Sequence, residues 1–62
     1  MPMSETAIHD YARQLWEARG SRAIAEAAQK ASRFEAQHNT DEAKTWRNIE
    51  AVLKSMRGPR ES

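Results

Sequence analysis

Apolar residues recur along this chain at a helical spacing in three successive segments. In the first segment they occupy positions i, i+3, i+4, i+7 and i+8 of one helical face: Ile8, Tyr11, Ala12, Leu15 and Trp16. The alternation of apolar and polar residues that marks a strand is absent, and β-branched residues are few. The pattern therefore predicts an all-α chain.

The second segment is rich in alanine, whereas the third carries larger side chains. The apolar line of the second segment is Ile24, Ala27, Ala31 and Phe34. The line of the third is Trp46, Ile49, Leu53 and Met56, flanked by Val52. Alanine favours helix and lets neighbouring backbones come close, but it supplies little apolar area. On the exposed side of the second segment, Glu26 and Lys30 are expected to pair at i, i+4.

Capping residues and glycines divide the chain into helices. Ser4 is the expected N-cap of the first helix, and Gly20 can take the left-handed conformation that ends it. Asn39 is expected to close the second helix in the same way, and Thr40 to cap the third. The alternative N-cap of the third helix is Asn39, which would place Glu42 at N3 as in a capping box. The Gly-Pro pair at 58–59 stops the third helix. The expected helices cover residues 4–19, 21–38 and 40–57, followed by a tail at 58–62.

The links between the expected helices are very short, and short links make consecutive helices antiparallel neighbours. At a rise of about 1.5 Å per residue, large side chains of the three helices come to matching heights. Tyr11, Phe34 and Trp46 meet near one end. We therefore expect one domain, a small antiparallel three-helix bundle with Trp46 in its core and with the second helix in contact with both others.

Charge and hydropathy exclude several classes of partner. Ten basic and nine acidic residues are interspersed, and the formal net charge of +1 gives no general attraction to phosphate backbones. The opening residues have no basic segment followed by an apolar one, and no apolar run approaches the ~20 residues that span a bilayer. The chain contains no cysteine, which suits a reducing compartment. We therefore expect a cytoplasmic protein that has no membrane partner.

Candidate catalytic and metal-binding residues do not converge. His9 and His38, the only histidines, are expected about 10 Å apart along the bundle axis, too far for a shared metal ion. His9 and Asp10 are adjacent and do not face each other on a helix. So small a bundle is also expected to leave no room for a pocket of about 300 Å³ or more. We therefore expect no enzyme activity, no metal and no cofactor.

Two features are candidates for a surface that binds another protein. Trp16 lies at the margin of its stripe, and although tryptophan is frequent in binding hot spots, the favoured interpretation is a core position with part of the ring exposed. Small residues on the second helix form what we call the small-residue strip: Ala25, Ala28, Ser32 and Ala36. The strip permits close approach either of a helix of the same chain or of a partner, and the sequence leaves both interpretations open.

Self-association is expected because the chain is small. A core built from 62 residues gives only about 3–5 kcal/mol, and no disulfide can add to it. Association with a second copy stabilises a folded chain by mass action. A homodimer is expected to bury Trp16 and the small-residue strip.

Nucleic-acid binding is the alternative function. The outer face of the third helix carries side chains suited to phosphates and base edges: Lys44, Arg47, Asn48, Lys54 and Arg57. Against this interpretation, Glu50 is interleaved among them and the links are too short for the crossed helices of a helix-turn-helix protein. The leading expectation is a non-enzymatic interaction module, a small regulator or accessory protein whose protein partner is unidentified.

The order of these features is similar to that in a group of small bacterial proteins. The similarity lies in YARQLWEARGSRAIAEAAQKA followed by NTDEAKTWRNIEAV, roughly residues 8–53. These segments resemble uncharacterised alphaproteobacterial proteins with a helix ending in glycine, an alanine-rich helix and a third helix carrying W-x-x-I after an acidic turn. The resemblance implies a bacterial cytoplasmic three-helix protein and carries over no catalytic residue.

Overall fold

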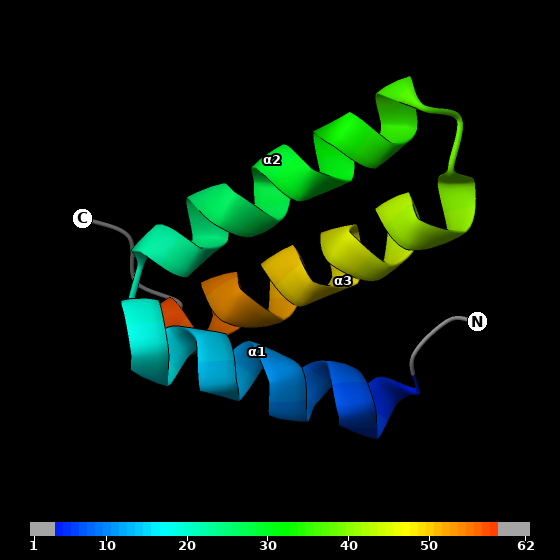
Figure 1. Ribbon diagram of the computed structural model, residues 1–62. Coiled ribbons are helices and arrows are strands. Elements are labelled where there is room, and N and C mark those ends of the chain that lie inside the picture. The colour runs from blue at the N-terminus through cyan, green and yellow to red at the C-terminus, as the bar shows by residue number, and fades with distance from the viewer. Residues whose placement is uncertain (1–3, 59–62) are drawn as a thin grey trace.

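The protein folds as three helices without a strand in the part of the chain that the structure, a computed structural model, describes: residues 4–58. The helices are α1 (Glu5–Arg19), α2 (Arg22–Ala36) and α3 (Thr40–Arg57). α1 and α3 run in the same direction and α2 runs in the opposite one (Figure 1). The all-α antiparallel three-helix fold expected from the sequence is confirmed. The expected tail lies outside the described residues beyond Gly58.

The boundaries of α1 follow from capping chemistry. The Ser4 hydroxyl accepts a hydrogen bond from the backbone N–H of Ala7 at 3.1 Å, as expected of an N-cap. At the other end Gly20 has φ of 63° and ψ of −142°, a conformation that side chains with a Cβ rarely adopt. Its N–H donates to the Trp16 carbonyl at 2.7 Å and closes the last turn.

α2 ends earlier than the sequence predicts, at Ala36 rather than His38. His38 has φ of 61° and takes the left-handed conformation that was expected at Asn39. Histidine is among the residues enriched in that region, so the turn forms one position sooner. The N–H of Asn39 then donates to the Phe34 carbonyl at 2.9 Å, and Asn39 becomes the N-cap position of α3 without a capping side-chain bond.

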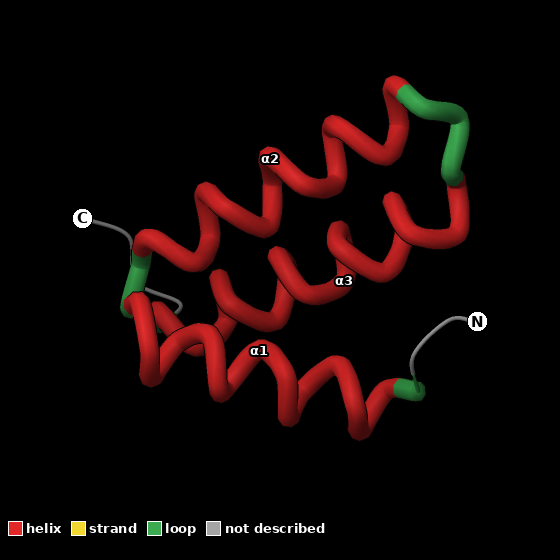
Figure 2. The backbone as a smooth tube through the Cα atoms, in the orientation of Figure 1, coloured by secondary structure: helices red, strands yellow, loops and turns green. Residues whose placement is uncertain are grey.

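α3 is the central helix of the bundle. Its backbone runs close to α2 over much of its length and less close to α1, whereas α1 and α2 make little contact with each other. α1 and α2 meet at their turn and diverge toward their other ends, as Figures 1 and 2 show. α2 does contact both other helices, as expected, but its contact with α1 is slight. Alanine on the inner face of α2 allows its close approach to α3.

The core is an aliphatic cluster centred on α3. Ile49 and Leu53 are its largest fully buried side chains. Buried residues of the other helices surround them: Ile8, Ala12, Ala23 and Ala27. Half-buried side chains close the edge of the cluster: Leu15, Trp16, Ile24, Trp46, Val52 and Met56. α1 and α2 thus both bury apolar area against the same two residues of α3.

Trp46 lies at the edge of the core and joins the two outer helices. Its ring meets Tyr11 of α1 edge-on, with centroids 5.8 Å apart and planes at 74°. The Nζ of Lys30 on α2 lies 5.4 Å from the Trp46 ring centroid. The contact confirms that Tyr11 and Trp46 share a height in the bundle. Trp46, expected in the core, packs against the core cluster, but its side chain is only half-buried.

Candidate protein-interaction face

The small-residue strip lies on the outer side of α2. Three of its four members are exposed, and Ala28 is half-buried. The buried residues of α2 lie on the other side of the helix: Ala23, Ala27 and Ala31. No helix within residues 4–58 covers the strip, so packing against a helix of the same chain does not account for it.

Part of the strip forms the floor of a shallow hollow. Ala28, Gln29, Ser32 and Arg33 line this hollow, which has a volume of about 630 Å³ and is widely open to solvent. The hollow is too open to be the kind of concave pocket, of about 300 Å³ or more, for which the bundle was expected to leave no room. The open form suits contact with another chain better than enclosure of a small molecule, which is normally buried over most of its surface.

Two arginines make one edge of the strip basic. Arg22 and Arg33 are about three turns apart and therefore lie on the same side of α2. Both are exposed, and neither forms an ion pair with another described residue. The carboxylates of α2 do not compensate them, because Glu26 accepts a hydrogen bond from Arg19 at 2.6 Å and Glu35 is bound by an arginine of α3.

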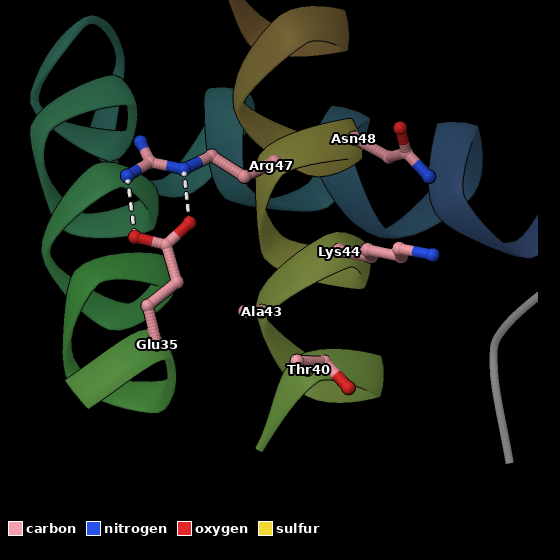
Figure 3. Close-up of a pocket in the computed structure, with 6 residues that line it drawn as sticks. All are labelled: Glu35, Thr40, Ala43, Lys44, Arg47 and Asn48. Carbon is pink, nitrogen blue, oxygen red and sulfur yellow. Dashed lines mark hydrogen bonds and ion pairs between the residues drawn. The ribbon is translucent and has the colours of Figure 1, made fainter. Parts of the chain in front are cut away.

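That arginine, Arg47, ties α3 to α2. Its Nε donates to Glu35 Oε2 at 3.2 Å and its Nη2 to Glu35 Oε1 at 3.1 Å, the paired geometry drawn in Figure 3. Its Nη1 donates to Glu50 Oε1 at 3.1 Å, and Lys54 Nζ lies 3.3 Å from Glu50 Oε2. The hydrogen bonds from Arg47 hold the pKa of Glu35 below its ordinary value, and both carboxylates raise the pKa of Arg47.

The ion pairs around Arg47 engage much of the surface proposed for nucleic acid. Arg47 and Lys54 are bound to carboxylates, and Arg57 is also engaged in an interaction. Lys44 and Asn48 are exposed and, in Figure 3, point away from the Arg47–Glu35 pair. They line an open groove of about 380 Å³ between α2 and α3, beside Glu35, Thr40 and Ala43. The cations of α3 are thus largely compensated, unlike the arginines of α2.

Trp16 does not share a face with the strip. It lies on α1, is half-buried and packs against the aliphatic cluster, which agrees with a core position that leaves part of the ring exposed. The strip faces away from that cluster. The strip with its arginine edge and Trp16 therefore belong to different parts of the surface.

The histidines remain apart, with His9 on α1 and His38 in the turn after α2, both exposed. Within residues 4–58, no group of three or more His, Asp or Glu side chains could hold a metal ion. In the same part of the chain no helix is long and apolar enough to cross a membrane.

No protein-family model, curated protein or solved structure matches this chain. The resemblance to alphaproteobacterial three-helix proteins therefore stays a prediction.

Proposed function

We propose that this chain is a non-enzymatic protein-interaction module, a small cytoplasmic regulator or accessory protein whose partner docks on the outer side of α2. One observation carries the proposal: the small-residue strip is uncovered, and the arginines along its edge have no partner among the described residues. Small side chains let a second backbone come close. Cations at the rim steer and orient a partner of opposite charge.

The charges favour an acidic helical segment of another protein as the occupant. From Arg22 to Ala36 the face is about 21 Å long, which matches a helix of about four turns. A helix with small residues toward the strip and carboxylates toward Arg22 and Arg33 would satisfy both features. The gain from these rim charges is expected mainly in association rate and specificity.

A second copy of this chain fits the same face less well. A two-fold axis that sets two α2 helices antiparallel brings identical edges of the two helices together. Arg22 of each copy would then lie near Arg33 of the other, and like charges placed together at an interface are unfavourable. The homodimer expected through the strip is therefore the weaker candidate for this surface.

Site-specific photo-crosslinking in cells that produce the protein tests the proposal. A photoreactive side chain at Ser32, in the strip, is expected to capture a defined protein. The same side chain at Ala51, which is also exposed but lies on α3, is the matched control and should not capture it. Reversing both charges with Arg22→Glu and Arg33→Glu should reduce the capture from position 32 at least tenfold. The captured segment should be acidic and should bind as a synthetic peptide.

A second charge-reversed variant distinguishes a local effect of the two arginines from an effect of the net charge of the chain. Arg13→Glu combined with Lys44→Glu changes the net charge by the same amount but lies away from the strip, and it should leave the capture intact. Equal capture from the strip and from α3, or loss of capture in this control pair alone, would contradict docking on α2. Captured material that a nuclease removes would instead support the nucleic-acid alternative.

A further inference from the structure

Gly20 is the residue at which the chain turns, so that α1 and α2 do not form one continuous helix. Between Glu5 and Ala36, the backbone departs from helical dihedrals only at Gly20, where φ is 63° and ψ is −142°. Ser21 already has helical values, with φ of −65° and ψ of −18°. Rotation about two backbone bonds of Gly20 would therefore convert the hairpin into one helix about 48 Å long.

The start of α2 has few of the groups that normally fix a helix terminus. The Ser21 side chain makes no capping bond, and the first turn carries no acidic residue. The N–H groups of Ala23 and Ile24 bond within the turn, to the carbonyls of Gly20 and Ser21 at 3.0 and 3.1 Å. In a continuous helix the same N–H groups would find partners four residues earlier. The turn is thus stabilised by the Gly20 conformation, the Arg19–Glu26 ion pair and the packing of α1 on α3.

α1 makes the least contact with the other helices, but the apolar surface that it covers on α3 has to stay covered. It contacts α3 less extensively than α2 does and scarcely contacts α2. Its residues Ile8 and Ala12 nevertheless pack in the cluster that fully buries Ile49 and Leu53. A chain whose α1 swung away alone would expose that cluster to water. The segment whose side chains fit this surface of α3 is another α1. We therefore expect a second copy of this chain to supply it.

We propose that this chain forms a dimer by exchanging α1, with Gly20 as the hinge. Each chain then contains one helix over residues 5–36, and α1 of each copy packs on α3 of the other. The packing of the monomer is retained between chains, including Tyr11 with Trp46 and Arg19 with Glu26. Exchange of an identical element costs little, because the interactions broken within each chain form again between the two chains. The inference does not depend on the partner proposed above, since the strip faces away from the exchanged helix.

Gly20→Ala tests the hinge. No described atom lies within 4 Å of the position that an added Cβ would occupy, so the substitution introduces no clash. It strains the closed turn, where φ is positive, and it favours the continuous helix. In each chain the substitution should shift the equilibrium from the closed turn toward the continuous helix by roughly tenfold. Because a dimer contains two hinges, the dimerisation constant should rise about a hundredfold. Sedimentation equilibrium across a wide concentration range measures it.

Two further variants control for effects unrelated to the hinge. Gly58 also has positive φ, of 112°, and open space around its Cβ position, but it follows α3. Gly58→Ala should therefore keep the dimerisation constant of the parent chain. Inserting a short Gly-Ser segment between Gly20 and Ser21 relaxes the closed turn and interrupts the long helix, so this variant should be monomeric.

Isotope-filtered NMR distinguishes exchange from contact between two surfaces. Labelled and unlabelled chains are unfolded together, refolded and concentrated, and an NOE is expected between Tyr11 of one chain and Trp46 of the other. The proposal is overturned if the parent and Gly20→Ala chains stay monomeric at millimolar concentration. It is equally overturned if a dimer forms while this NOE stays within one chain. Should Gly20→Ala fail to fold, the NOE in the parent chain decides.

Discussion

α3 meets its two neighbours through different chemistry. Against α2 the contact is long and close, with alanines on the inner face of α2 and the Arg47–Glu35 ion pair at its edge. Against α1 the contact is shorter and relies on larger apolar groups, among them Ile8 and the edge-on pair of Tyr11 and Trp46. Close backbone approach and apolar area are therefore supplied by different helices.

This difference determines what each interface contributes to stability. Hydrophobic stabilisation scales with the apolar area removed from water, and alanine removes little of it. The extensive contact of α2 with α3 therefore yields less free energy than its length suggests. Larger apolar side chains, among them those of α1 and the fully buried Ile49 and Leu53 on which both interfaces depend, supply more area for each residue. A substitution at Ile49 should consequently affect both interfaces. One at Trp46 should affect mainly the interface with α1, and one at Glu35 only the edge of the interface with α2.

The largest effect is expected where the two interfaces meet. Ile49→Ala removes a fully buried side chain from a cluster shared by all three helices and should lower the free energy of unfolding by about 2–5 kcal/mol. Urea titration followed by circular dichroism at a fixed low concentration measures the loss. Ser55→Ala, exposed on the same helix, should change the value by less than about 0.5 kcal/mol. Similar values for the two variants would show that α3 does not hold the core.

The next effect concerns the aromatic contact between α1 and α3. Trp46→Ala should lower the free energy of unfolding by about 2–3 kcal/mol, less than for a fully buried tryptophan, since the ring is half-buried. A double-mutant cycle with Tyr11→Ala should give a coupling of about 0.5–1.5 kcal/mol, the usual range for an aromatic pair. A coupling near zero would mean that the edge-on contact does not hold α1 on α3.

The starts of α1 and α3 offer a comparison of capping. The Ser4 hydroxyl bonds to the Ala7 N–H, so Ser4→Ala should lower the free energy of unfolding by about 1 kcal/mol. Asn39 occupies the same position before α3, but its side chain makes no capping bond, so Asn39→Ala should cost clearly less. Thermal melts of both variants check the order. The reverse order would indicate that Asn39 caps α3 in solution.

The local features of the fold could be predicted from the sequence because they depend on neighbouring residues. Helical spacing, Ser4 and Gly20 placed α1 correctly, and a constant rise per residue placed Tyr11 beside Trp46. The end of α2 was misplaced because His38 and Asn39 both tolerate positive φ, and only the closed turn selects between them. That α3 is the central helix could not be predicted, because periodicity gives the buried side of each helix but not which pair packs most closely.

The same limit applies to the candidate surface. The sequence identified the small-residue strip, but whether a helix of the chain covers it depends on which helix is central. The charges around it were also not predictable from local spacing: Glu26 pairs with Arg19 across a turn rather than with Lys30, which lies over Trp46 instead. These partners come from other helices, so only the folded chain reveals that no carboxylate within residues 4–58 pairs with Arg22 or Arg33.

The smallest effect is expected at the ionic edge of the α2–α3 interface. Hydrogen bonds from Arg47 lower the pKa of Glu35 in the folded chain, so its charged form stabilises the fold above the unfolded pKa. That contribution is lost as the pH falls through the lowered, folded-state pKa. The melting temperature of the parent should therefore exceed that of Glu35→Gln at neutral pH, and the difference should vanish in acid. It should also shrink in high salt, since the pair is exposed.

Melting both proteins from about pH 7 to about pH 3 tests this dependence. Glu17→Gln, which removes a carboxylate on α1 that forms no ion pair with a described residue, is the matched control and should not reproduce it. Because the interface of α1 with α3 depends on apolar contact, acid should weaken the α2 edge before it affects Tyr11 and Trp46. A difference between parent and Glu35→Gln that persists unchanged in acid would mean that the Arg47–Glu35 pair adds nothing to the α2–α3 contact, leaving that interface to its alanines alone.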